Sequence, residues 1–175
     1  TGAATIDGEE YEFSVQGAEN PREEDGSTTP KGKTIPKYGA VFKIDAAAPV
    51  NISFALSAAA GKIYHFSKVE VAEDGTETIV EDKSEPNALA QATTLKFEMD
   101  AGFRYYFYLE GSKLKVYDIS YLIDETRQPV VTESVAITTE GLKQAETYGN
   151  PELVSINVME DMKGSPVTPA KVIDG

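Results

Sequence analysis

The feature that most constrains the fold is the recurrence of short apolar stretches separated by turn residues. Between residues 10 and 123 about eight such stretches, rich in Val, Ile, Phe, Tyr and Thr, are divided by Gly, Pro, Asp or Asn. Helical periodicity is almost absent from this part of the chain. Strands of this length at a spacing of roughly 8 to 12 residues are typical of sandwiches and barrels. We therefore expect an all-β, antiparallel fold.

Local patterns predict where the strands turn. Asp74-Gly75 is a turn dipeptide between two β-branched stretches, which predicts a hairpin. Long loops are expected at 17–37 and 82–93. In the stretch 114–123 the apolar residues change parity, and a β-bulge near Tyr117-Asp118 would keep them all on the core side. The remaining strands are expected at 10–15, 40–44, 50–56, 95–99 and 105–109.

The chain changes character after residue 124. We expect a β-sandwich module over 1–124, and over 125–175 a linker with a small strand and helix extension. Thr139 would cap a short helix over 140–148, Gly149 would end it, and Pro151 would prevent its continuation. Further strands are expected at 130–138, 153–159 and 170–173. The extension either docks on the sandwich or opens a neighbouring module.

Charge and composition exclude several functions. The chain has 16 Lys and Arg against 29 Asp and Glu, a net charge of −13, which disfavours nucleic acids and anionic membrane surfaces. It lacks an apolar run of the roughly 18 to 20 residues that a membrane helix needs. It has no cysteine, so thiol nucleophiles, disulfides and thiolate metal sites are ruled out. The high charge is consistent with solubility alone.

Catalytic signals are weak. The only histidine, His65, lies between aromatic residues in a predicted strand, where a packed ring is more common than a catalytic base. The absence of Trp argues against a deep sugar cleft, and pairs of carboxylates carry little information among 29 acids. We expect no enzymatic activity.

An aromatic strand is the first candidate binding site. If Tyr105, Phe107 and Leu109 face the core, then Arg104, Tyr106 and Tyr108 line the opposite face. Tyrosine rings stack on sugar faces and their hydroxyls form hydrogen bonds. His65 and Lys113 would supply polar partners to a carbohydrate bound there. The alternative is that these tyrosines pack beneath a loop or the tail.

The acidic loop at residues 19–26 is the second candidate. Its carboxylates, among them Glu23, Glu24 and Asp25, would supply oxygen ligands to calcium. The spacing does not match an EF-hand loop, and a solvated acidic loop is the alternative interpretation. No other cofactor is indicated.

Three segments carry a resemblance to known modules. They are Gly39 to Ile44, the stretch Ala101-Gly102-Phe103-Arg104-Tyr105-Tyr106-Phe107-Tyr108, and Gly111-Ser112-Lys113-Leu114 with the strand that follows. Over about residues 8–123 the chain resembles jelly-roll, carbohydrate-binding-type accessory modules of secreted bacterial polysaccharide-degrading proteins, notably pectin-active ones. The resemblance implies a jelly-roll-like β-sandwich, a secreted or cell-surface location and neighbouring modules in the same polypeptide.

Two functions follow as expectations. The first is a non-catalytic extracellular module that binds a polysaccharide or oligosaccharide, with a neutral glycan favoured because the chain is acidic. The second is a structural or protein-interaction module of a bacterial surface protein or multi-enzyme assembly, with no sugar site. An exposed row of tyrosines near a groove would favour the first, and tyrosines buried under the 125–175 tail would favour the second.

Overall fold

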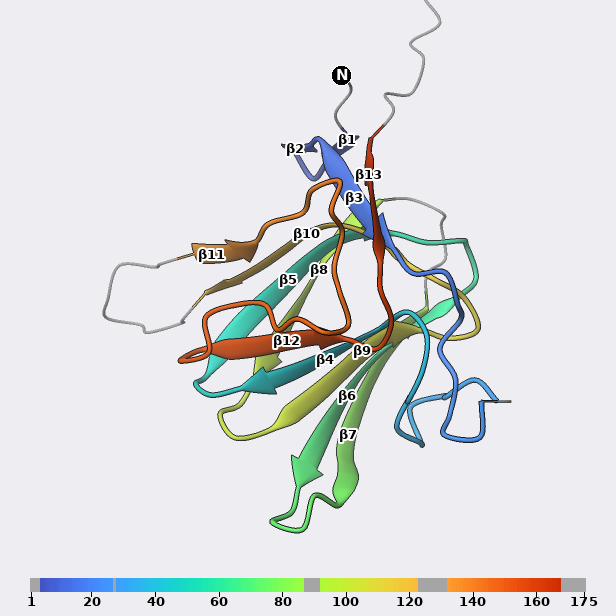
Figure 1. The fold of residues 1–175 in the computed structure, drawn as a ribbon, viewed down its shortest axis with the longest axis vertical. Helices are drawn as coiled ribbons and strands as arrows, with labels where there is room; N and C mark the ends of the chain where they lie inside the picture. The colour runs from blue at the N-terminus through green and yellow to red at the C-terminus, as the bar shows by residue number, and fades with distance from the viewer. Residues whose placement is uncertain (1–3, 27, 87–91, 123–131, 168–175) are drawn as a thin grey trace, which may run out of the picture.

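Strands account for all the regular structure that the chain forms in the part described. The computed structural model describes residues 4–26, 28–86, 92–122 and 132–167. These residues form thirteen β-strands and no helix, so the described part offers no helix that could cross a membrane. Two antiparallel sheets face each other, and a small ribbon of β1 (Ala4–Ile6) and β2 (Glu9–Tyr11) lies at one end (Figure 1). The prediction of an all-β fold is confirmed.

The two sheets have six and five strands. In spatial order the six-stranded sheet contains β13 (Lys163–Pro166), β3 (Phe13–Gln16), β10 (Lys115–Leu122), β5 (Val50–Ser57) and β8 (Thr93–Met99), with β11 (Thr132–Val135) also paired to β10. The five-stranded sheet contains β12 (Val154–Val158), β4 (Val41–Ala46), β9 (Arg104–Leu109), β6 (Ile63–Val71) and β7 (Glu77–Pro86).

The strand pairing is nested, and it gives the jelly-roll arrangement that was expected. β6 pairs with β7, β5 with β8, β4 with β9 and β3 with β10. The chain from β3 to β10 is therefore one long folded ribbon whose successive pairs alternate between the two sheets. β12 and β13 then extend the two sheets beside β4 and β3, and β11 pairs with the end of β10 that β3 leaves unpaired.

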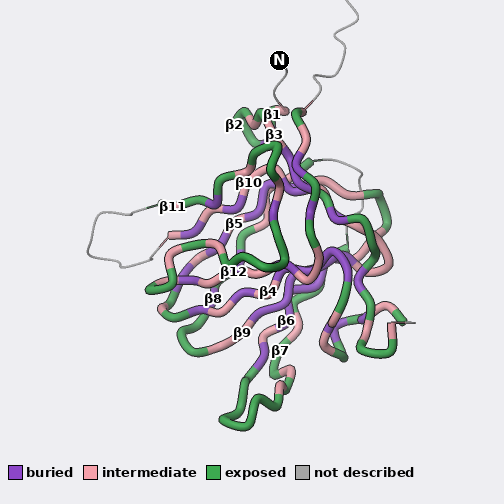
Figure 2. Tube along the Cα trace, in the orientation of Figure 1, coloured by how far each residue is buried: buried purple, intermediate pink, exposed green. Residues whose placement is uncertain are grey.

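Buried residues recur along the strands of both sheets (Figure 2), and their apolar side chains form the core between the sheets. Aromatic rings form its centre: Phe54 and Phe107 lie 4.4 Å apart between ring centroids, and Phe66 and Phe97 stack at 4.1 Å. Rings at these separations add about 0.5 to 1.5 kcal/mol per pair to the stabilisation from burial. Because these residues come from both sheets, the aromatic cluster fixes how the sheets face each other.

Two local predictions are confirmed. The pairing of β10 with β5 shifts register between Val116 and Asp118, and the four residues that the bulge was expected to keep on the core side are all buried: Leu114, Val116, Ile119 and Tyr121. The β6–β7 turn is closed by hydrogen bonds from Gly75 N to Ala72 O and from Ala72 N to Thr76 O, with Gly75 at φ 87°.

Two others are wrong. The expected loop at 82–93 begins later, because β7 continues to Pro86 alongside β6. The expected helix over 140–148 is absent: this segment consists of turns, and it pairs instead with the tail through the bridges Leu142–Met162 and Tyr148–Ile156. Gly141 has φ 69° there, and a Cβ on it would overlap the Met162 carbonyl oxygen. The backbone of this segment lies against the backbone of the tail and forms hydrogen bonds with it, in place of the local hydrogen bonds of a helix.

The described part of the extension belongs to both sheets. The strands expected at 130–138 and 153–159 are present as β11 and β12, whereas the strand expected at 170–173 lies outside the described residues. The segment 136–150, between β11 and β12, covers one side of the sandwich, and its Leu142 is fully buried in the core. On the opposite side, β7 and β8 are the outermost strands of the two sheets.

Candidate functional site

The outer face of the five-stranded sheet gathers most of the residues that were predicted to bind a ligand. Along β9, Tyr105, Phe107 and Leu109 point into the core, and Tyr106 and Tyr108 point the other way, as expected. However, the side chains of Tyr106 and Tyr108 are only 2% and 0% exposed. The two rings therefore do not form an open stacking platform in this structure, and carbohydrate binding by Tyr106 and Tyr108 stays a prediction.

A segment of the long loop covers these rings. Residues 30–38, called the strap below, lie over the outer face with Pro30, Gly32 and Pro36 buried. Ile35 of the strap packs against a small apolar cluster, and Ile79 and Met159 pack against it as well. This cluster is made of Val41, Val69, Tyr106 and Tyr108. The tyrosines thus belong to a second, smaller core between the sheet and the strap.

The first of two polar clusters under the strap surrounds the Glu77 carboxylate. Arg104 Nη1 donates to it at 3.0 Å, Lys37 Nζ of the strap at 3.1 Å, and the Tyr106 hydroxyl makes a short hydrogen bond to the same oxygen as Arg104. Burial alone would raise the pKa of Glu77, but the hydrogen bonds from its three donors outweigh this and lower the pKa. Arg104 also donates from Nε to Asp45 at 2.8 Å. This arrangement fastens the strap to β7 and β9.

The second cluster surrounds His65, which is 4% exposed. Its Nδ1 lies 2.8 Å from Asp82 Oδ2, and its Nε2 lies 2.8 Å from Glu110 Oε2. Burial would lower the pKa of His65, but the hydrogen bonds to the two carboxylates outweigh this and raise it. Ser67 Oγ donates to the other oxygen of Asp82 at 2.7 Å. The His65 ring also stacks on Tyr108, at 5.2 Å between centroids.

These contacts do not form a nucleophilic site. Hydroxyl activation requires a base whose ring nitrogen faces the hydroxyl. Here the Ser67 hydroxyl gives its hydrogen bond to Asp82, and both nitrogens of His65 face carboxylates. Ser67 is also fully buried, so a substrate has no access to it. What the arrangement can do chemically is hold charge and a proton beneath the strap.

The five residues predicted for carbohydrate binding therefore separate into three groups. Arg104 and Tyr106 lie at the Glu77 cluster, and His65 and Tyr108 lie at the His65 cluster. Lys113 contacts neither cluster through a hydrogen bond, and its Nζ donates instead to the carbonyl of Ala18 at 2.9 Å.

The acidic loop is held together by contacts within the protein. The Glu23 carboxylate accepts a hydrogen bond from the Thr34 hydroxyl of the strap at 2.8 Å, and Arg22 pairs with Glu19 at 2.8 Å. Over residues 4–26, 28–86, 92–122 and 132–167, no group of three or more His, Asp or Glu side chains is placed to hold a metal ion. Calcium binding by Glu23, Glu24 and Asp25 stays a prediction, without a preformed cluster to support it.

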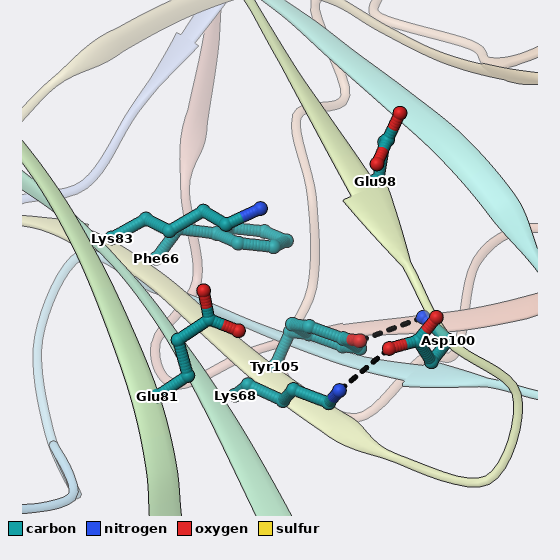
Figure 3. A pocket seen from close by; sticks show the side chains of 7 residues that line it. All are labelled: Phe66, Lys68, Glu81, Lys83, Glu98, Asp100 and Tyr105. Carbon is teal, nitrogen blue, oxygen red and sulfur yellow. Dashed lines mark hydrogen bonds and ion pairs between the residues drawn. The ribbon is translucent and has the colours of Figure 1, made fainter.

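A small hollow lies at the open side of the sandwich, between β7 and β8 (Figure 3). It measures about 70 Å³ and is floored by the rings of Phe66 and Tyr105. Lys68 crosses it to pair with Asp100 at 2.6 Å, which ties β6 to the end of β8. Next to it is a wider groove of about 590 Å³ that runs from the six-stranded sheet to β7 of the five-stranded sheet, lined by Asn51, Ser53, Lys83, Glu85, Lys96, Phe97, Glu98 and Leu122.

Sequence reasoning missed the acidic partners of both clusters. Asp82 was assigned to a loop, and neither Glu77 nor Glu110 was singled out. Only the strand register could have identified them. For Asp82, His65 pairs with Ser84 across β6 and β7, and residues two apart in a strand share a face, so Asp82 and Ser84 both lie on the face of His65.

Comparison with known protein families, with curated proteins and with solved structures gives no match.

Proposed function

We propose that the chain is a non-catalytic module of a larger secreted or cell-surface protein, and that its role is structural or protein-binding. The observation that carries this proposal is the burial of Tyr106 and Tyr108, the rings expected to stack on a sugar. Aromatic side chains that serve as sugar platforms must be open to the ligand, whereas these form a second core beneath the strap. A non-catalytic role is also supported by His65, because both of its ring nitrogens form hydrogen bonds with carboxylates of the protein.

Affinity electrophoresis of the whole chain tests this proposal. The chain is run through native gels containing starch, xylan, glucomannan, pectin or β-glucan, each with calcium and with chelator. We expect the same mobility as in a gel without polysaccharide, for every glycan. Retardation in any of these gels would refute a purely structural role.

Carbohydrate binding is the second candidate function, and the groove on the six-stranded sheet is the observation that favours it. Its volume of about 590 Å³ falls within the usual range of ligand pockets. It presents amide, hydroxyl and charged groups beside the apolar side chains of Phe97 and Leu122, a mixture that suits a polar, neutral glycan.

If retardation is observed, a pair of variants tests whether the glycan is bound in this groove. Lys96→Ala removes an exposed side chain from the groove, and Lys31→Ala removes an exposed lysine of the strap with the same change in charge. A glycan bound in the groove predicts faster migration through the retarding gel for Lys96→Ala only. Equal migration of both variants would place the binding elsewhere.

A further inference from the structure

The only histidine of the chain lies directly beneath the strap, between two carboxylates. A neutral imidazole has one N–H group and can donate to one of them only. Donation to both Asp82 and Glu110 requires the doubly protonated ring. The imidazolium therefore donates to both carboxylates and balances part of their charge, whereas without it the site would hold two partly buried negative charges.

We propose that His65 is a proton-dependent latch that holds the strap against the outer face of the five-stranded sheet and releases it when the ring loses its proton. The inference goes beyond the proposed function, because it concerns how the fold responds to its surroundings. Loss of the proton changes the charge of the three side chains from −1 to −2. It also turns a ring lone pair toward a carboxylate oxygen at 2.8 Å, which is repulsive.

The strap is in direct contact with this cluster at Gly32. A Cβ built on Gly32 would overlap the Asp82 carboxylate and would lie 2.8 Å from His65 Nδ1, so the strap backbone rests on this pair. The Gly32 amide donates to the Tyr108 hydroxyl at 2.8 Å, and the Tyr108 ring stacks on His65. A shift of Asp82 away from a neutral ring therefore moves the groups on which Gly32 sits.

The charged and titratable groups around the ring come from every element packed against it. β7 contributes Asp82, β9 contributes Tyr108, and Glu110 follows β9. The strap contributes Lys31 and Lys33, which flank Gly32 and are exposed. The nearest charges to the imidazole are therefore the two carboxylates, and both favour its protonated form.

The pKa shifts of His65 and Asp82 determine how the hold on the strap changes with pH. The pKa of His65 is raised in the folded chain, so its contribution is complete below about 6.5, the unfolded value, and is lost as pH rises through the folded pKa. The pKa of Asp82 is lowered despite its burial, because His65 and Ser67 donate to it. Its contribution is lost as pH falls through that lower value. The strap is held most firmly between these two pKa values.

Two measurements on the intact chain test the latch. Because there is only one histidine, its ring signals in an NMR spectrum of labelled protein give its pKa without a variant, and the Gly32 amide signal reports on the strap in the same titration. Separately, trypsin cleavage after Lys31 and Lys33 is followed between pH 6 and 9, a window that starts below the unfolded pKa of about 6.5. The variant His65→Gln, measured at each pH, corrects for the pH dependence of the protease itself.

We expect the His65 signal to titrate above pH 6.5 and the Gly32 amide to shift with the same midpoint. Cleavage in the strap, relative to His65→Gln, should rise through that midpoint by a factor that approaches ten for each unit by which the pKa exceeds 6.5. A pKa at or below 6.5 would overturn the proposal. A raised pKa with no change at Gly32 and no change in relative cleavage would also overturn it, because His65 would then be an ion pair without influence on the strap. If His65→Gln fails to fold, the titration alone decides.

Discussion

Replacement of Tyr108 by alanine tests whether this tyrosine is packed in a core or is open to a ligand. The side chain is fully buried, and truncation of a buried aromatic ring costs about 3 to 5 kcal/mol. The variant also removes the acceptor of the Gly32 amide, and a buried donor without a partner costs roughly 1 to 3 kcal/mol more. We expect Tyr108→Ala to lose about 4 to 8 kcal/mol, a large share of the 5 to 15 kcal/mol by which domains are usually stable.

The assay is urea unfolding at pH 7, followed by far-UV circular dichroism and extrapolated to water. Tyr38→Ala is the matched control, because Tyr38 belongs to the same strap and is 52% exposed. Its cost should stay near 0.5 kcal/mol, as for most surface substitutions. Tyr108→Phe keeps the ring and removes only the hydroxyl, so it should cost about 1 to 3 kcal/mol.

The reasoning fails if Tyr108→Ala is no more destabilising than Tyr38→Ala. That result would mean that the strap does not cover the ring in solution. The outer face would then be open, and Tyr106 and Tyr108 would again be available for stacking on a glycan.

Three further substitutions test other contacts in the same unfolding assay. Glu77→Gln should cost roughly 2 to 4 kcal/mol at pH 7, because it removes a charge that accepts three hydrogen bonds. The pKa of Glu77 is lowered, so this difference should shrink as pH falls below about 4, and a difference constant to pH 3 would contradict the assignment. Gly32→Ala should be far more destabilising than Gly26→Ala, since both glycines have φ 74° but only Gly32 has neighbours in the way; equal costs would show that the strap is loose. Gly141→Ala should likewise exceed Gly75→Ala, whose Cβ would meet open space, and a mild Gly141→Ala would show that segment 136–150 is not packed on the tail.

The sequence predicted those features that depend on neighbouring residues. Alternation identified the strands and the two faces of β9, and the parity change near Tyr117 located the bulge. It did not predict what covers a face, because the strap and β9 are about 75 residues apart, as the hydrogen bond from Gly32 to Tyr108 shows. The helix prediction failed for a related reason: Thr139 and Gly149 are sound local signals, but the segment between them pairs with β12 and with the residue before β13.

The polar clusters were beyond such reasoning for a further reason. His65 meets Asp82 across one hairpin and Glu110 across a different strand pair, so both registers must be known before the three residues can be grouped. An aromatic neighbourhood around a lone histidine indicated packing, which is true of its ring. It said nothing of the two acids at its nitrogens.

The antiparallel pairing of β3 with β13 determines how the module would respond to mechanical force. Phe13 lies opposite Pro166, and Val167 N donates to Glu12 O at 2.8 Å just beyond them. A pull between the chain before Glu12 and the chain after Val167 therefore loads these hydrogen bonds one after another, as in peeling, and not all at once, as in shear. Strand β13 should peel away at low force while the nested pairs β4 to β9 stay closed. Glu12 and Val167, the two points at which the force would act, are also adjacent. The folded sandwich would therefore lie to one side of the stretched chain and add little to its end-to-end length.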